Sequence, residues 1–413
     1  MNFDIRDFGA EANSLKINTK AIQAAIDACH QSGGGTVVIC GGVYKSGGLF
    51  LKSNVELRIE RGAVLQASTD RKDYFSDVFC QLYEGEPHMD GCFLFCKDAQ
   101  NVALTGGGCI DGNGAAFLNS DFRPMLLRWL HCKKIHLEGL RLVDPASWTN
   151  DFVCCQNISA RGLRIESRAN WNGDGLDFNA CEGVIVSDCF FDCSDDCICL
   201  QNSEEDHICR DVVVTNCIFR SHWAGMRIGL LSCGDIRNLT VSNCIFRDIE
   251  CSGIKIQACE GGNITDLLFE NLVMEEVCRP VFITQNRYRR RIGRPQEVAD
   301  AGRIERVFFR DLSFREKEGA VNSCMIIDSE QMGSIRDVYF DRVFLRVSGG
   351  VTGDYCNPHN VHKGVQAEAY NYSGNLPASG LYCTGAENVC CKDFTVRKDV
   401  WDGREDLVFQ NDK

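Results

Sequence analysis

An internal repeat begins near residue 100, and it constrains the fold more than any other feature of the chain. Short apolar segments such as KIHLEG and DVVVTN recur at intervals of about 30 residues, a length typical of solenoid coils. Alignment of these segments places one apolar position at Val102, Ile135, Ile158, Val184, Val212, Leu239, Leu267, Val307 and Val338. Equivalent residues of successive coils stack in a solenoid, so we expect this column to form a continuous core.

Two further columns of the repeat are apolar throughout. The first consists of Leu140, Leu163, Cys189, Cys217, Cys244, Leu272, Leu312 and Val343. The second consists of Leu142, Ile165, Phe191, Phe219, Phe246, Met274, Phe314 and Leu345. The residue before the first column tolerates a left-handed or side-chain-bonded turn, and these residues are Gly139, Gly162, Asp188, Asn216, Asn243, Asn271 and Asp311. Because the repeats contain no amphipathic helix and are unlike a propeller blade, they predict an all-β, single-stranded parallel β-helix.

The N-terminal region departs from the repeat. Residues 18–30 are predicted to form an amphipathic helix, because their apolar residues share one face and Gly33, Gly34 and Gly35 follow. The residues of that face are Ile22, Ala25, Ile26 and Cys29. We expect this short helix to cap the end of the apolar core.

The predicted organisation is a single β-helix domain over residues 1–413. Its N-terminal cap and first coils lie in 1–60, the regular coils that carry the site lie in 100–348, and the C-terminal coil and tail lie in 349–413. Residues 71–95 interrupt the pattern with an acidic and aromatic stretch, which we expect to be a long surface loop.

Composition narrows the classes of function. The net charge of −13 argues against nucleic acid and acidic membranes as partners. The N-terminus shows no basic region followed by an apolar run, and no stretch resembles a membrane span, so we expect a cytoplasmic protein whose 26 cysteines are reduced thiols. The cysteine spacing lacks the paired ligands of a zinc site, and we expect neither a metal nor a cofactor. The oligomeric state does not follow from the sequence.

Each central repeat contains another strand, as in GLDFN and CICLQ, in which apolar residues alternate with others. Alternation turns Leu176, Phe178, Ile198, Leu200, Met226, Ile228, Ile254, Ile256, Val281 and Ile283 inward. One outward row then contains Asp177, Cys199, Arg227, Lys255 and Phe282, and the next contains Asn179, Gln201, Gly229, Gln257 and Thr284. Acids in the earlier coils and bases in the later ones are thus predicted to share one wall.

Three aspartates come just before these strands. Asp174 lies two residues before Leu176, and Asp195 and Asp196 lie at the matching place one coil later. Stacked coils would gather the three carboxylates, and like charges a few ångströms apart raise one another's pKa, so that one group holds a proton at neutral pH. A proton donor beside a proton acceptor can serve as the general acid and the general base of a hydrolysis reaction. Asp174, Asp195 and Asp196 are therefore the candidate catalytic residues.

At these residues the chain resembles the polygalacturonase family, glycoside hydrolase family 28. Asn172, Gly173 and Asp174 match the family's Asn-x-Asp motif, and Asp195 with Asp196 matches its Asp-Asp pair one coil on. The segments DFGA and GGGCIDGNG also read like the family's N-terminal half. The resemblance implies a right-handed parallel β-helix and hydrolysis with inversion. It also implies that Asp195 is the general acid and that Asp174 and Asp196 position and deprotonate water.

Two departures from the family's motifs concern substrate binding. Ala224 stands where the family has a histidine, and the Arg-x-Lys motif has become Lys255, Ile256 and Gln257. The resemblance implies that the basic pair binds the substrate's carboxylate, and Arg227 in the same row would restore the second charge with a planar guanidinium. The resemblance also gives an aromatic residue that closes the sugar subsite. The expected substrate-binding residues are Asn172, Arg227, Lys255, Gln257, Tyr288, His222 and Trp223.

We expect an intracellular, exo-acting glycosidase whose partner is a short pectin-type oligosaccharide, a galacturonide or a related glycan. Three alternatives stay open. The same fold serves lyases, epimerases and fructotransferases. A neutral-sugar glycosidase would keep the acids and not the carboxylate-binding role of the bases. A non-catalytic β-helix, either carbohydrate-binding or structural, would not use the acids for catalysis.

Overall fold

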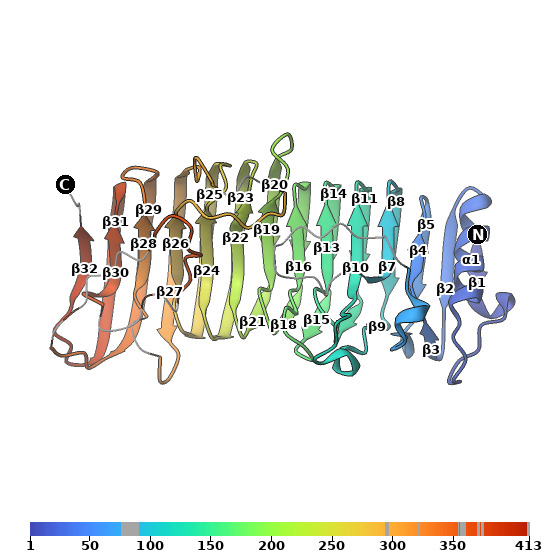
Figure 1. Ribbon diagram of the computed structural model, residues 1–413. Helices are drawn as coiled ribbons and strands as arrows, with labels where there is room; N and C mark the ends of the chain where they lie inside the picture. Colours follow the sequence, from blue (N-terminus) through green and yellow to red (C-terminus); the bar gives the residue numbers. More distant parts are fainter. Residues whose placement is uncertain are drawn as a thin grey trace. The chain divides into compact units, whose positions relative to one another are not determined.

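The described part of the chain forms two compact units. The computed structural model describes residues 1–75, 91–293, 297–320, 323–353, 355, 361–369, 372 and 376–410. Unit 1 is Met1–Asp195 and unit 2 is Asp196–Lys413. Short strands dominate both units, coloured blue to green along unit 1 and green to red along unit 2 (Figure 1). The expectation of one domain stays a prediction.

Unit 1 begins with a capping region. Its only α-helix among the described residues, α1 (Thr19–Gln31), lies beside β1 (Asn2–Asp4) and β2 (Gly35–Ile39) (Figure 1). The predicted apolar face of α1 is fully buried, and it contains Ile22, Ala25, Ile26 and Cys29. Short 3-10 helices follow the strands in three places, η1 (Ile5–Phe8), η2 (Arg71–Asp73) and η3 (Gly114–Phe117). The predicted capping helix is confirmed to within one residue at each end.

The other strands of unit 1 form three parallel ladders. The first contains β2, β5 (Val55–Ile59), β8 (Gln100–Gly106), β11 (Lys133–Glu138), β14 (Gln156–Arg161) and β17 (Glu182–Ser187). The second contains β3 (Gly42–Ser46), β6 (Ala63–Ala67), β9 (Cys109–Asp111), β12 (Arg141–Val143), β15 (Arg164–Ser167) and β18 (Phe190–Cys193). The third contains β4 (Leu49–Leu51), β7 (Cys92–Lys97), β10 (Met125–Leu130), β13 (Asn150–Val153) and β16 (Leu176–Asn179).

Unit 2 continues the same pattern with longer strands. One ladder contains β20 (Cys209–Thr215), β21 (Ile218–Ser221), β23 (Ile236–Ile249), β25 (Ile264–Val277), β27 (Ile304–Glu316), β29 (Ile335–Gly349) and β31 (Ala386–Val400). The other contains β19 (Ile198–Asn202), β22 (Ala224–Ser232), β24 (Ser252–Ala258), β26 (Val281–Gln285), β28 (Met325–Ser329), β30 (Ala378–Thr384) and β32 (Glu405–Gln410). Every pairing in both ladders is parallel.

The strand register confirms the predicted core columns. In unit 1, Ile135 pairs with Val102 on one side and with Ile158 on the other. In unit 2, Leu267 pairs with Leu239 and with Val307. All members of the three apolar columns are buried. Parallel coils with stacked apolar columns, and without an α-helix after α1 in the described residues, are the parallel β-helix that the repeat predicts.

The predicted turn column is also confirmed. Its residues all have positive φ, from 52° to 71°, and they are Gly139, Gly162, Asp188, Asn216, Asn243, Asn271 and Asp311. Asparagine and aspartate tolerate this left-handed conformation because their short side chains bond locally. In unit 2 the Nδ2 atom of Asn271 donates to Oδ1 of Asn243 at 2.6 Å, so neighbouring turns are also joined through side chains.

Two expectations concern the surface and the cysteines. Residues 76–90, most of the predicted 71–95 loop, lie outside the described residues, and β7 already begins at Cys92. None of the cysteines among the described residues forms a disulfide. Cys189, Cys217 and Cys244 are buried in the apolar column and act as small hydrophobic residues.

No helix of the described chain is long and apolar enough to cross a membrane.

Candidate active site

The turn before β16 carries the Asn-x-Asp motif, and side chains of unit 1 fix it. The Gly173 N–H donates to Oγ of Ser194 at 3.0 Å, and Oγ of Ser167 donates to the Gly173 carbonyl at 2.6 Å. A Cβ atom on Gly173 would lie 2.2 Å from the Ser167 carbonyl oxygen, so only glycine fits there. Because Ser194 directly precedes Asp195 and Gly173 directly precedes Asp174, this network joins the two turns that carry these acids.

Arg123 holds the other residue of the motif. Its guanidinium donates to Oδ1 of Asn172 and to the Trp171 carbonyl, both at 2.8 Å, and it lies 4.3 Å from the centre of the Trp171 ring. Arg123 is only 2% exposed. Asn172, predicted to bind substrate, therefore has a structural partner. Arg123 lies outside the aligned repeat segments and 49 residues before Asn172, so the sequence pattern gave no signal for it.

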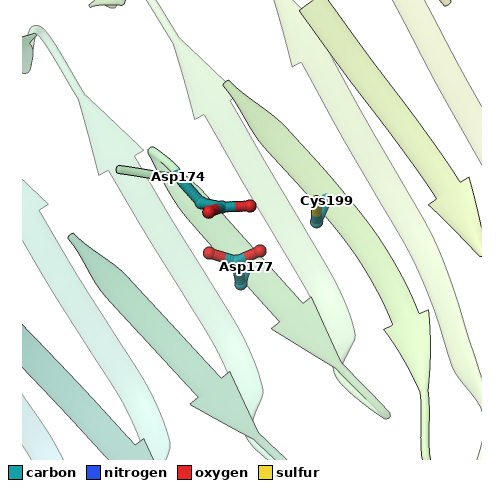
Figure 2. A group of neighbouring side chains, drawn as sticks. All are labelled: Asp174, Asp177 and Cys199. Carbon is teal, nitrogen blue, oxygen red and sulfur yellow. The ribbon is translucent and has the colours of Figure 1, made fainter. Parts of the chain in front are cut away.

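The turns bring two predicted catalytic carboxylates of unit 1 together. Asp174 and Asp195 approach to within 4.8 Å between carboxylate oxygens. Asp174 is 6% exposed and Asp195 is half-buried, so Asp195 is the more accessible of the two. Asp177, on β16, is fully buried, and its carboxylate and that of Asp174 point toward each other (Figure 2). The predicted approach of Asp174 and Asp195 is thus confirmed within this unit.

The outward row of unit 1 extends further than the sequence indicated. Asp177 pairs in register with Asp151 on β13, and Asp151 pairs with Arg128 on β10. Nε of Arg128 lies 3.4 Å from Oδ2 of Asp151, and both residues are buried. Burial raises the pKa of Asp151, and the nearby positive charge of Arg128 opposes that rise. The alignment of outward positions began at Asp177, and for that reason it missed this buried pair.

In unit 2 the predicted wall is confirmed in register. Cys199 pairs with Arg227, Arg227 with Lys255, and Lys255 with Phe282. Gln257 follows two residues after Lys255 and pairs with Thr284 in the next strand. This wall is covered, since Lys255 is 0% exposed and Gln257 is 2% exposed.

The residues that cover the wall belong to the segment 361–369. Nε2 of Gln257 donates to the Ala367 carbonyl at 2.6 Å. Nδ2 of Asn286 donates to the Val365 carbonyl at 2.7 Å, and the Gly364 N–H donates to the Arg287 carbonyl at 2.7 Å. Backbone carbonyls and amides thus attach the segment along the wall at several points.

A buried ionic cluster joins this segment to the wall. One carboxylate oxygen of Glu368 forms an ion pair with Nζ of Lys255, and the other lies 3.3 Å from Nη2 of Arg227. Nε of Arg227 lies 3.1 Å from Oδ2 of Asp196. Asp196, Lys255 and Glu368 are at most 1% exposed at their side chains, and Arg227 is 13% exposed. We refer to Asp196, Arg227, Lys255 and Glu368 as the ionic cluster.

The two acids of the ionic cluster differ in protonation behaviour. Burial raises the pKa of Asp196, and the charges of Arg227 and Lys255 only partly oppose that rise. Burial also acts on Glu368, but there the attraction of Lys255 and Arg227 wins and the pKa is lowered. Glu368 is therefore the firmly ionised member. No motif in the sequence pointed to it, because it lies 113 residues after its partner Lys255.

The remaining predicted residues occupy different environments in unit 2. The Trp223 ring lies 5.0 Å from Nζ of Lys255, beside the ionic cluster. His222 is exposed, with Nε2 3.9 Å from Oε1 of Glu250. Tyr288 is half-buried in the segment after β26, and its N–H donates to the Cys259 carbonyl at 3.2 Å. Of these three, the structure brings only Trp223 to the basic pair.

The comparisons with known proteins concern the family and the fold. Glycosyl hydrolases family 28 matches residues 29–367. An exo-poly-alpha-D-galacturonosidase of Dickeya chrysanthemi is 33% identical over 118 residues, which cover 27% of this chain and 19% of that protein. A probable polygalacturonase of Vitis vinifera is 24% identical over 305 residues, which cover 68% of this chain and 62% of that protein. The chain thus spans less than two thirds of the length of both relatives.

A solved structure supports the fold. The family 28 exopolygalacturonase of Yersinia enterocolitica superposes with a TM-score of 0.75 at 21% identity, covering 99% of this chain and 78% of that one. An identity this low concerns the fold alone. Because the family match extends over most of the sequence and the coils agree with it, this chain belongs to glycosyl hydrolases family 28.

Proposed function

We propose that the protein hydrolyses glycosidic bonds in pectin-type oligosaccharides, galacturonides or related glycans. The observation that carries the proposal is the approach of Asp174 and Asp195 to within 4.8 Å on turns joined through Ser194. Two adjacent carboxyl groups divide the work of acid and base when their environments differ. Membership of family 28 supports glycoside hydrolysis as the reaction.

Asp195 is the general acid in this proposal. It is half-buried, whereas Asp174 is buried, so a leaving-group oxygen reaches Asp195 more readily. Asp174 then positions and deprotonates the water in this proposal, as the family resemblance implies. The same role for Asp196 rests on the resemblance alone and stays a prediction. The sequence prediction that the reaction needs no metal or cofactor stays a prediction.

Inversion and exo action are the finer parts of the proposal. Inverting glycosidases usually separate their two carboxyl groups by roughly 6.5–9.5 Å to admit water. The approach of Asp174 and Asp195 is closer than that, so inversion rests on the family resemblance and not on this distance. One relative, from Dickeya chrysanthemi, is named as an exo-acting enzyme, and its name supports exo action here.

The test is release of reducing ends from a panel of oligogalacturonides, rhamnogalacturonan fragments and neutral oligosaccharides. Asp174→Asn and Asp195→Asn should each abolish release. Asp188→Asn is the matched control, because asparagine already occupies this turn position at Asn216 and Asn243. Activity that survives both active-site substitutions would refute the proposed roles.

Product analysis separates the finer parts. Monosaccharide released from the start of the reaction indicates exo action, and proton NMR of the first product reports its anomeric configuration. A lyase would instead give a product with a new double bond and its ultraviolet absorbance.

A further inference from the structure

The ionic cluster of unit 2 carries no net formal charge when its four members are ionised. Arg227 and Lys255 contribute two positive charges, and Asp196 and Glu368 contribute two negative charges. All four are largely withdrawn from water, so solvent screens their interactions weakly. The basic pair that was expected to bind the substrate's carboxylate therefore already faces carboxylates of its own chain.

Glu368 occupies this pair as a bound carboxylate would. Its two oxygens are shared between the two cations, one facing Arg227 and the other facing Lys255. Nε2 of Gln366 donates to the oxygen that faces Arg227 at 2.8 Å. Charge-assisted bonds of this kind are the usual way in which proteins hold a ligand carboxylate.

The backbone around Glu368 is fixed on the wall. Gln257 binds the carbonyl of the preceding residue, Ala367, and Asn286 binds the carbonyl of Val365. Glu368 itself is 1% exposed. An incoming carboxylate would have to displace a buried, hydrogen-bonded anion or lie beside it, and like charges placed together are costly.

A pocket of about 240 Å³ opens next to the cluster. Trp223 and Ala369 line it, and these two residues lie beside Lys255 and directly after Glu368. The charged residues of its lining are one acid, Glu250, and one base, Arg279. The pocket thus has an aromatic residue, a type that packs against sugar rings, in its lining and no excess of positive charge.

We propose that Glu368 determines substrate specificity and that the sugar accepted beside Arg227 and Lys255 is neutral. This inference rests on the proposed function and names the substrate class of the same site. A sugar with a hydroxymethyl or methyl group at C5 fits a neutral cluster, whereas a uronate adds a second carboxylate next to Glu368. The substrate is then a pectin-type glycan with a neutral residue at this position.

The probes are D-galactose and D-galacturonate, which differ only in whether C6 is a hydroxymethyl group or a carboxylate. Binding of each to the wild-type protein and to Glu368→Gln is measured by calorimetry or ligand-observed NMR. The wild-type protein should bind galactose at least as tightly as galacturonate. Glu368→Gln keeps the side-chain shape, removes one negative charge and should shift the affinity ratio toward galacturonate by about tenfold or more.

Two further variants complete the design. Gln257→Lys also gives the cluster one net positive charge and can still donate to Ala367, so it should shift the ratio in the same direction even if Glu368→Gln fails to fold. Asp311→Asn is the control, because Asp311 pairs with Arg342 outside the cluster. The ratio should stay unchanged in that variant.

A wild-type protein that prefers galacturonate, a ratio that neither Glu368→Gln nor Gln257→Lys changes, or failure of both sugars to bind any variant would overturn the inference. Hydrolysis is measured in parallel. An unchanged ratio together with hydrolysis that depends on Asp195 would refute the role of Glu368 and leave the proposed function intact. A shifted ratio without hydrolysis of any glycan would support the role of Glu368 and refute the proposed function.

Discussion

Removal of the positive charge of Lys255 tests the energetics of the ionic cluster. Lys255→Met keeps the length of the side chain and its packing beside Trp223, but it leaves Glu368 buried with one cation fewer. Breaking a buried ion pair by removal of one partner costs about 3–5 kcal/mol. Arg227 and Gln366 still contact Glu368, so we expect a loss below this range, about 2–3 kcal/mol.

The assay is a double-mutant cycle on thermal unfolding, followed by circular dichroism. For a domain the size of unit 2, about 2–3 kcal/mol corresponds to a fall in melting temperature of roughly 4–12 °C. Lys255→Met combined with Glu368→Gln removes both charges, so it should recover most of the loss, with a coupling energy of about 1.5 kcal/mol or more. Simple additivity of the two single changes, or a loss below about 0.5 kcal/mol for Lys255→Met, would contradict the buried pair.

Two other substitutions report on the acid turns and on pH. Gly173→Ala forces a Cβ atom into the Ser167 carbonyl and displaces Asp174 from Asp195, so kcat should fall by about 100-fold, and full activity would refute the turn geometry. The pKa of Glu368 is lowered in the folded state, so its stabilisation is complete above the usual glutamate value of 4.5 and is lost as pH falls through the folded value. Unfolding free energy should therefore decline on acidification more steeply in the wild-type protein than in Glu368→Gln, by up to about 1.4 kcal/mol per pH unit, and parallel profiles would exclude the effect.

The coil register could be predicted from the sequence because each coil repeats the same short apolar pattern. A misaligned repeat would disagree with the repeats on either side, so the neighbouring repeats fix the positions of residues such as Ile135 and Leu239. The aspartate turns follow from the same register, since Asp174 and Asp195 stand at equivalent points of successive coils. The outward row through Arg227 and Lys255 was predictable for the same reason.

Contacts made outside the repeat left no such signal. Arg123 reaches Asn172 across 49 residues, and Glu368 reaches Lys255 across 113 residues. Neither arginine nor glutamate sits in a periodic pattern there, so the sequence showed a wall of outward bases and not the segment 361–369 that covers it. As a result, the sequence predicted that Arg227 and Lys255 bind a ligand's carboxylate, whereas in the structure they bind the carboxylate of Glu368.

The distance in sequence between Lys255 and Glu368 also sets an order of events during synthesis. At about 5–20 residues per second, the 113 residues between them take roughly 6–23 s to appear. The coils that contain Arg227 and Lys255 can stack during this time, while water still solvates the two charged side chains. Arg227 and Lys255 gain the carboxylate of Glu368 only when the segment 361–369 has been synthesised. Arrest of translation before that segment would therefore leave stacked coils whose basic side chains are exposed, whereas the finished protein covers them.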